Sequence, residues 1–256
     1  MWRGPVVQAR KNAVNTIKWK KFSIHAKLIS IAAQKSGDLE QNPSLVAAIY
    51  KAKKDWVPNE NIDRAIKKWT GEDKSALQIL EIIYEWYAPG WVAVMVSVLT
   101  DNKNRTVSNI RHIFTKYGWN MWESWAVSWM FHRKGVIFID SSKYDFWEIE
   151  TLIYETNAED IVWEKFYIKI ITTVDDFDNV EKFLENKWIE IMEAKIDYVA
   201  NNEVEIIDFD KALKIKKMIE TFQEDEDVNL VSTNEIISDE LHKEVDEFIE
   251  KNTFKS

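Results

Sequence analysis

The segment from residue 135 to about residue 200 constrains the fold of this 256-residue chain more than any other. Its apolar residues switch between the alternating period of strands and the longer period of helices. The pattern predicts strands at 136–139, 161–163, 166–172 and 189–199, and helices at 146–154 and 180–186. This βαββαβ order is that of the ferredoxin-like arrangement. We therefore expect a ferredoxin-like domain over residues 135–203.

The segments on either side predict a second domain, which the ferredoxin-like domain interrupts. Strand patterns at 79–86 and 92–99 are separated by Ala88-Pro89-Gly90, a turn signal, and predict a hairpin followed by a helix. Near the end of the chain, a helix at 208–222 and a strand at 228–232 precede an acidic tail. These late elements can complete the sheet that begins at residue 79. We expect residues 77–134 and 204–256 to form one discontinuous α/β domain.

Residues 1–76 predict a small helical domain, so that the whole chain belongs to the α+β class. A helical pattern runs over about 9–34, in two pieces. Asn42-Pro43 then provides a cap residue followed by proline at the first helical position. A third, short helix follows Pro58, with Arg64, Lys67 and Lys68 on its solvent side.

The charge of the chain is divided unevenly. The first acidic residue is Asp38, and eight Lys and Arg residues precede it. Residues 1–75 hold 15 basic and 7 acidic residues, a balance of +8 within a chain whose net charge is -9. Lys and Arg that neutralise phosphates supply most non-specific nucleic-acid affinity, so a basic helical domain indicates a polyanionic partner. The alternative is an ordinary solvated helix face.

We therefore expect nucleic acid as the partner. The predicted nucleic-acid-binding residues are Arg3, Arg10, Lys11, Lys18, Lys20, Lys21, Lys27, Arg64, Lys67, Lys68, Lys103 and Arg105. The loop before the predicted helix is dense in hydrogen-bonding groups, from Asp101, Asn102, Asn104 and Thr106. It can bind an anion at the helix N-terminus or serve a structural role, in which its side chains bond the backbone turn.

Other classes of function find little support in the sequence. The chain has no cysteine, and its four histidines lie far apart without the spacing of metal ligands. No phosphate-binding glycine motif or nucleophile motif is present. We expect no catalytic residue, no metal, no cofactor and no small-molecule substrate. We also expect no membrane association and a cytoplasmic location, although a basic, acid-free start is also typical of a mitochondrial presequence.

Several stretches carry a resemblance to a known family. They include Asn42-Pro43, Arg64-Ala65-Ile66-Lys67-Lys68, Tyr84-Glu85-Trp86-Tyr87-Ala88-Pro89-Gly90-Trp91 and Leu99-Thr100-Asp101-Asn102-Lys103-Asn104-Arg105-Thr106. Together they resemble the YebC/PmpR family of probable transcriptional regulators, which includes the mitochondrial translational activator of cytochrome oxidase subunit I. The resemblance implies three domains, the second split by an inserted ferredoxin-like third, and no catalytic chemistry. It implies DNA binding and transcription control, or ribosome association that relieves stalled translation. The partner that it implies is accordingly DNA or ribosomal RNA, the latter within the ribosome.

The acidic residues of the chain are open to more than one interpretation. The run 224–227 is most simply a solvated turn before the last strand, or a group that repels nucleic acid and so orients the basic domain. The ferredoxin-like domain and its acidic residues also suggest a third class, a protein-interaction module. That class predicts binding that survives the loss of Lys18, Lys20 and Lys21 together.

The chain has 13 tryptophans and only 6 glycines, an inversion of ordinary usage. Eight tryptophans occupy positions where the family generally has glycine: Trp19, Trp69, Trp86, Trp91, Trp119, Trp122, Trp125 and Trp188. We hypothesise that the gene uses UGA as a glycine codon and was translated under a code that reads UGA as tryptophan. The alternative is an aromatic platform that stacks bases. Trp129 is different, because the family tolerates aromatics there, and we expect it in a strand.

Overall fold

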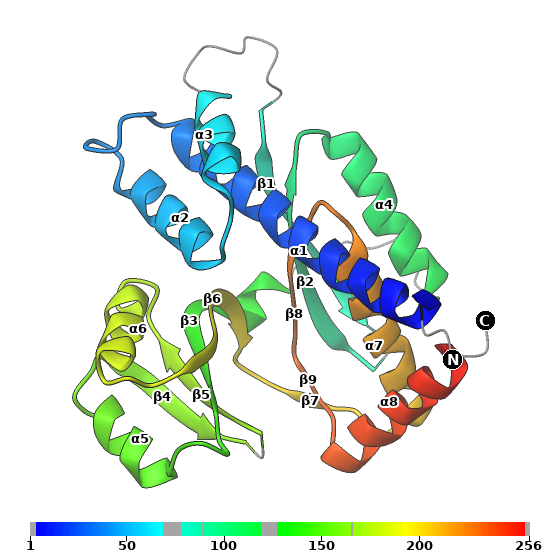
Figure 1. Ribbon diagram of the computed structural model, residues 1–256. Coiled ribbons are helices and arrows are strands. Elements are labelled where there is room, and N and C mark those ends of the chain that lie inside the picture. Colours follow the sequence, from blue (N-terminus) through cyan, green and yellow to red (C-terminus); the bar gives the residue numbers. More distant parts are fainter. Residues whose placement is uncertain (1–3, 69–77, 89, 119–126, 165, 254–256) are drawn as a thin grey trace. The chain divides into compact units, whose positions relative to one another are not determined.

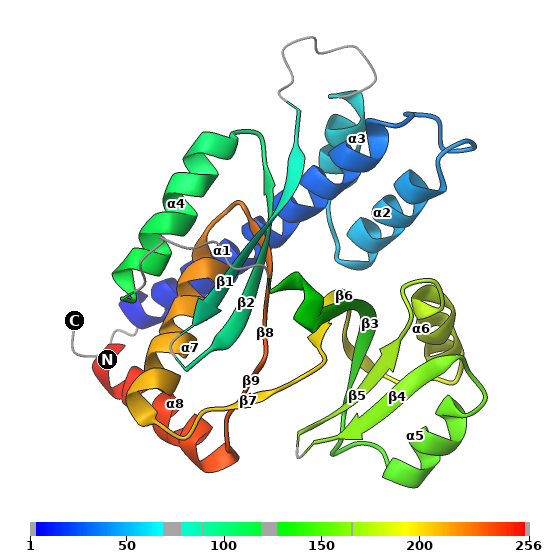
Figure 2. The ribbon, with the colours of Figure 1, turned by 180° about the vertical axis from the view of Figure 1, so that it is seen from behind.

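The computed structural model describes residues 4–68, 78–88, 90–118, 127–164 and 166–253, and describes side chains from Lys18 onward. The chain divides into two compact units. The first comprises Met1–Tyr84, Val96–Glu123 and Leu213–Val231; the second comprises Glu85–Met95, Ser124–Ala212 and Ser232–Ser256. Figures 1 and 2 show the elements from opposite sides. Among the predicted binding residues, Arg3 and the side chains of Arg10 and Lys11 lie outside the described part.

The first unit begins with three helices, α1 (Gly4–Ala33), α2 (Pro43–Lys54) and α3 (Asn59–Lys67). The prediction of two pieces for the first helix was wrong, because α1 is continuous. No proline or glycine occurs between Pro5 and Gly37, so nothing in this stretch breaks the helical hydrogen bonds. The start of α2 follows the prediction: the Asn42 side chain accepts a hydrogen bond from the Leu45 amide at 3.1 Å.

A small apolar core holds these helices together. It contains Phe22 and Ile29 of α1, Leu45 and Ala52 of α2, and Ile62 and Ala65 of α3. The apolar residues of α3 recur at spacings of three and four, which places them on one face and leaves the charged residues on the other. The core thus determines which cations of α1 and α3 remain at the surface.

A three-stranded sheet has the order β1-β2-β8, formed by β1 (Leu80–Ala88), β2 (Val92–Thr100) and β8 (Val228–Thr233). The prediction that the late strand completes the early sheet is confirmed. Every residue of the central strand β2 is buried. Helices α4 (Lys103–Lys116) and α7 (Phe209–Glu224) meet through an edge-to-face contact of Phe114 and Phe222, whose ring centroids lie 4.9 Å apart.

The second unit contains the predicted ferredoxin-like arrangement. Its elements are β3 (Phe131–Asp140), α5 (Phe146–Ile153), β4 (Ala158–Trp163), β5 (Tyr167–Thr172), α6 (Phe177–Asn186) and β6 (Ile191–Ala200). The sheet is antiparallel with the order β4-β5-β3-β6. Pairs such as Ile137 and Ile170 share a face of this sheet, where they pack with Ile149 of α5 and Leu184 of α6. Both helices therefore cover the same face (Figure 2).

One glycine of this domain is required by packing. A Cβ atom added to Gly135 would collide with the Phe177 side chain and the Thr172 hydroxyl. The missing side chain lets the start of α6 approach β3 closely.

Three features of the second unit differ from the predictions or go beyond them. The acidic tail contains a helix, α8 (Asp239–Thr253), in which Val245 is buried and Phe248 meets Phe209 edge to face. Trp129 lies in a short 3-10 turn, Ser128–Met130, so its placement in a strand was wrong. A parallel two-stranded pair, β7 (Val204–Glu205) and β9 (Glu235–Ile236), was not predicted.

Three tryptophans occupy unusual backbone positions. Trp56, Trp91 and Trp188 have φ values of 59°, 65° and 63°, in the left-handed region, and all three are exposed. Trp19 lies in the middle of α1, and Trp86 is buried in β1. The other positions of the hypothesis, Trp69, Trp119, Trp122 and Trp125, lie outside the described residues.

Candidate nucleic-acid interface

Lys18 and Lys21 of α1 both have contact partners within the first unit. Lys18 lies over the Phe22 ring, 5.4 Å from its centroid. Lys21 forms an ion pair with Asp55 at 2.6 Å, and Asp55 also contacts the His25 ring at 2.6 Å. These contacts orient the lysines, and they reduce the charge that Lys21 offers to a partner.

Lys20 is more enclosed than Lys18 and Lys21. Its ammonium group donates a hydrogen bond to the Gln223 carbonyl at the end of α7. Burial lowers the pKa of Lys20 below its ordinary value, and the nearby carboxylate of Asp225 only partly opposes this effect. Lys20 thus satisfies a carbonyl at the end of a helix, where a cation is favoured.

Asp227 is the centre of a buried polar cluster, so the prediction of a solvated turn for 224–227 was wrong at this residue. Only 5% of Asp227 is exposed. Its carboxylate accepts hydrogen bonds from Lys27 of α1 at 2.9 Å, and from Arg105 and Thr106 of α4, both at 2.8 Å. The hydrogen bond from Lys27 holds the turn 224–227 against α1. A buried carboxylate needs partners of this kind, because a buried charge without them is costly.

The ionisation of Asp227 reflects these contacts. Burial raises its pKa, but the hydrogen bonds from Lys27, Arg105 and Thr106 outweigh burial, so that the pKa is lower than the ordinary value. The carboxylate is therefore charged at neutral pH and neutralises part of the basic face.

The polar loop before α4 is bonded largely to itself. Asn102 caps the helix by accepting a hydrogen bond from the Arg105 amide at 3.1 Å. The Thr106 hydroxyl contacts the Thr100 hydroxyl at 2.7 Å, and the Arg105 guanidinium also reaches Asp101 at 3.1 Å. Lys103 and Asn104 are exposed on the first turn of α4. The cap occupies one of the amides that an anion at this helix end would use.

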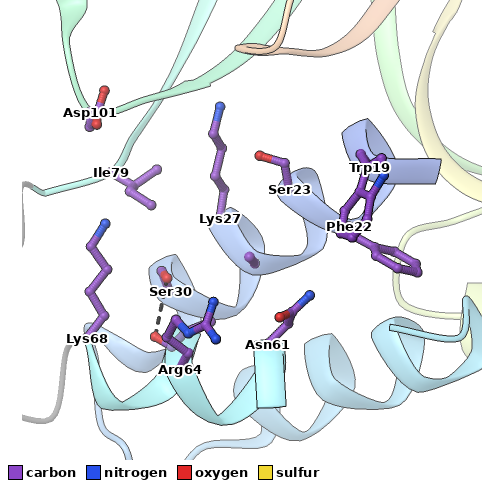
Figure 3. A pocket seen from close by; sticks show the side chains of 12 residues that line it. Trp19, Phe22, Ser23, Lys27, Ser30, Asn61, Arg64, Lys68, Ile79 and Asp101 are labelled. Atoms are coloured by element: carbon purple, nitrogen blue, oxygen red, sulfur yellow. Dashed lines mark hydrogen bonds between the residues drawn. The ribbon is translucent and has the colours of Figure 1, made fainter. Parts of the chain in front are cut away.

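A hollow in the first unit brings several of the predicted cations together. We call it the α1–α3 hollow; its volume is about 460 Å³. It is lined by Trp19, Phe22, Ser23, Ala26, Lys27, Ser30, Asn61, Arg64, Ala65, Lys68, Ile79 and Asp101. Figure 3 shows the Lys27, Arg64 and Lys68 side chains extending into it from α1 and from the end of α3. Cations and apolar groups thus line the same recess.

The structure thus separates the predicted residues into groups. Lys27, Arg64 and Lys68 meet at the hollow, whereas Lys67 is exposed and does not line it. Three polar side chains of the lining, Ser23, Ser30 and Asn61, were not predicted from the sequence. A signal was available for two of them, since Ser23 precedes Lys27 by four residues and Asn61 precedes Arg64 by three, so that each shares a helix face with a predicted cation.

Comparison with known proteins shows what the chain resembles. The family model described as the TACO1/YebC protein N-terminal domain matches residues 5–72, and the model described as the TACO1/YebC second and third domain matches residues 79–235. The chain belongs to the TACO1/YebC family. The family resemblance inferred from the sequence is thereby confirmed.

Individual members of this family match nearly the whole chain. A protein of Halothermothrix orenii named a probable transcriptional regulatory protein is 39% identical over 94% of this chain and 96% of its own length. One of Syntrophus aciditrophicus with the same name is 42% identical over 92% of this chain and 94% of its own length. The crystal structure of a conserved hypothetical protein from Aquifex aeolicus matches with a TM-score of 0.76 and 39% identity, over 86% of this chain and 90% of that one.

Metal binding and membrane insertion are two further kinds of function that the structure bears on. Within residues that the structure describes, no cluster of three or more His, Cys, Asp or Glu side chains has the arrangement of a metal site. In the same part of the chain, no helix has the length and apolar character needed to cross a membrane.

Proposed function

We propose that this protein is a non-enzymatic, cytoplasmic regulator of gene expression that binds nucleic acid through the basic face of its helical domain. The observation that carries the proposal is the convergence of Lys27, Arg64 and Lys68 on one hollow. Cations that gather on one surface raise the local affinity for a polyanion. The names of the relatives, probable transcriptional regulatory proteins, support a role in regulation.

In the binding mode that we propose, most contacts are to the sugar-phosphate backbone of the nucleic acid. A typical sequence-specific DNA-binding protein inserts a projecting helix into the major groove, and side chains of that helix contact the base edges. Here the cations of α3 line a recess instead, next to apolar groups of α1. Such a surface contacts phosphates and does not need a particular base sequence.

A ribosome-associated translation factor is the second candidate. A recess lined by cations suits the irregular backbone of folded RNA, which proteins recognise by shape and phosphate contacts. Ribosomal RNA is the largest such target in a cytoplasm. A protein-interaction module is the third class, and it predicts binding that does not depend on the basic face.

Binding measurements test the proposal itself. We expect fluorescence anisotropy to detect binding of labelled duplex DNA, or of a ribosomal RNA hairpin, with an affinity that falls linearly with salt on logarithmic axes. Binding that is absent from both probes at low salt, or that does not change with salt, would refute it.

Crosslinking in the native host distinguishes a transcriptional regulator from a ribosome-associated translation factor. Ultraviolet light attaches the protein to its nucleic acid, which is then purified and sequenced. Ribosomal RNA enriched at defined positions identifies a translation factor, and promoter DNA enriched at discrete sites identifies a transcriptional regulator.

A further inference from the structure

We infer that the α1–α3 hollow binds one phosphate group of a nucleic-acid chain. This inference rests on the proposed function and makes it specific to a site. The hollow has a volume of about 460 Å³, within the range of about 300–1,000 Å³ that small-ligand sites occupy. It has room for a phosphate and part of the attached nucleotide.

Arg64 and Lys68 supply the charge. They lie four residues apart, at the end of α3, and so are neighbours on the same face. A guanidinium group presents a planar fork that matches two phosphate oxygens, and an ammonium group adds a point charge beside it. Among the described residues, neither side chain has an ion-pair partner, so their charge is available to a ligand.

Both helices add weaker polar groups. Ser23 of α1 offers a hydroxyl donor, and the Asn61 amide of α3 points into the hollow beside Arg64 (Figure 3). Lys27 also faces the hollow, but it already donates to Asp227 and to the Glu226 carbonyl, both at 2.9 Å. Its contribution is therefore to the field of the site more than to direct contact.

Two lining residues do not assist anion binding. The Asp101 carboxylate is negative, but the Arg105 guanidinium compensates it at 3.1 Å. The Ser30 hydroxyl donates to the Ala65 carbonyl at 3.3 Å and is occupied. Trp19 borders the hollow at a position where we expect glycine in the native protein, so the inference does not use its ring.

The test compares the full-length protein with the double variant Arg64→Gln/Lys68→Gln. The probes are single-stranded oligouridylate and oligothymidylate of about 12 nucleotides and a DNA duplex, which show whether RNA, DNA or a duplex supplies the phosphate. We expect about tenfold weaker binding at low salt and a salt slope reduced by about one. Arg64→Lys/Lys68→Arg keeps the charges and should keep the slope.

A matched control removes the same charge elsewhere. Arg133→Gln/Lys182→Gln alters two exposed cations of the ferredoxin-like domain and should leave the slope unchanged. Circular dichroism checks that the Arg64/Lys68 variant is folded. If the wild type binds and this folded variant binds with the same salt slope, the hollow does not bind the phosphate, although the proposed function stands. If the wild type binds neither these probes nor the ribosomal RNA hairpin, the proposed function fails as well.

A separate observation carries a second inference. In the described part of the chain, every residue with a left-handed φ is either glycine or tryptophan, namely Gly90, Gly118, Trp56, Trp91 and Trp188. A bulky side chain is a genuine outlier in this region, whereas glycine adopts it without steric cost. We infer that residues 56, 91 and 188 are glycine in the protein as its host makes it. Residue 56 was not among the positions that the sequence indicated.

Peptide mass spectrometry of the protein purified from its native host tests this inference. Peptides that carry glycine at positions 56, 91 and 188 support it. Tryptophan at these positions overturns it and leaves the chain with three strained, exposed aromatic residues. A further peptide that covers position 19 would decide that residue, on the border of the hollow.

Discussion

Replacement of Asp227 by asparagine should destabilise the first unit by about 3 kcal/mol. Lys27 is only 18% exposed, and a hydrogen bond from a charged group in such a place contributes about 1.5–3 kcal/mol. Arg105 is 51% exposed, so its ion pair adds less than about 1 kcal/mol. The Thr106 hydroxyl adds about 1 kcal/mol, and the amide oxygen of asparagine recovers part of this total.

The assay is urea unfolding followed by circular dichroism at pH 7, with Glu226→Gln as the matched control. That substitution also removes one negative charge, but Glu226 is exposed and only its main-chain carbonyl contacts Lys27. We expect the control to change the free energy of unfolding by less than about 0.5 kcal/mol. Equal effects of the two substitutions would show that net charge matters and that the buried cluster does not.

The pH dependence provides a second readout of the same cluster. The pKa of Asp227 is lowered in the folded protein, so the folded state holds its proton less tightly than the unfolded state does. The stabilisation is complete above the unfolded pKa of about 3.9, and it is lost as the pH falls through the folded pKa. Asp227→Asn should remove this part of the acid dependence. An unchanged acid profile in the variant would contradict the assignment.

Three further substitutions test other parts of the structure. Gly135→Ala should destabilise the ferredoxin-like domain by about 1–3 kcal/mol, since the new methyl group must displace Phe177; a melting temperature equal to that of the wild type would contradict this close packing. Trp188→Gly should stabilise the protein by about 1 kcal/mol in thermal unfolding, because it relieves a left-handed backbone; a lower melting temperature would argue that the ring is needed. Asn42→Ala should cost about 2 kcal/mol in urea unfolding, because Asn42 caps α2 and its buried amide donates to the Ala32 carbonyl at 2.8 Å; no loss would show that the cap is dispensable.

Local patterns were sufficient to predict the ferredoxin-like domain. Its strands and helices are short, apolar and separated by polar turns, so their order alone selected the topology. Helix α8 was missed because its sequence is mostly charged, and its few apolar contacts, such as that of Phe248 with Phe209, involve a distant segment. Local periodicity does not contain such information.

The candidate site was predictable only in part. The basic character of α1 and α3 is visible in the sequence, but which cations are free and which are neutralised depends on tertiary contacts. Lys27 and Asp227 are 200 residues apart, and no local rule pairs them. Arg64 and Lys68 could be placed on one helix face, whereas their approach to Ser23 of α1 required the packed core.

The separation of Lys27 from Asp227 also has a consequence for biosynthesis. At about 5–20 residues per second, a ribosome needs about 10–40 s to synthesise the residues between them. During that interval the nascent helix α1 carries Lys20 and Lys27 without the Gln223 carbonyl and the Asp227 carboxylate that later hold them. Lys20 and Lys27 therefore stay available to the nearby ribosomal RNA until α7 and the turn that follows it have been synthesised.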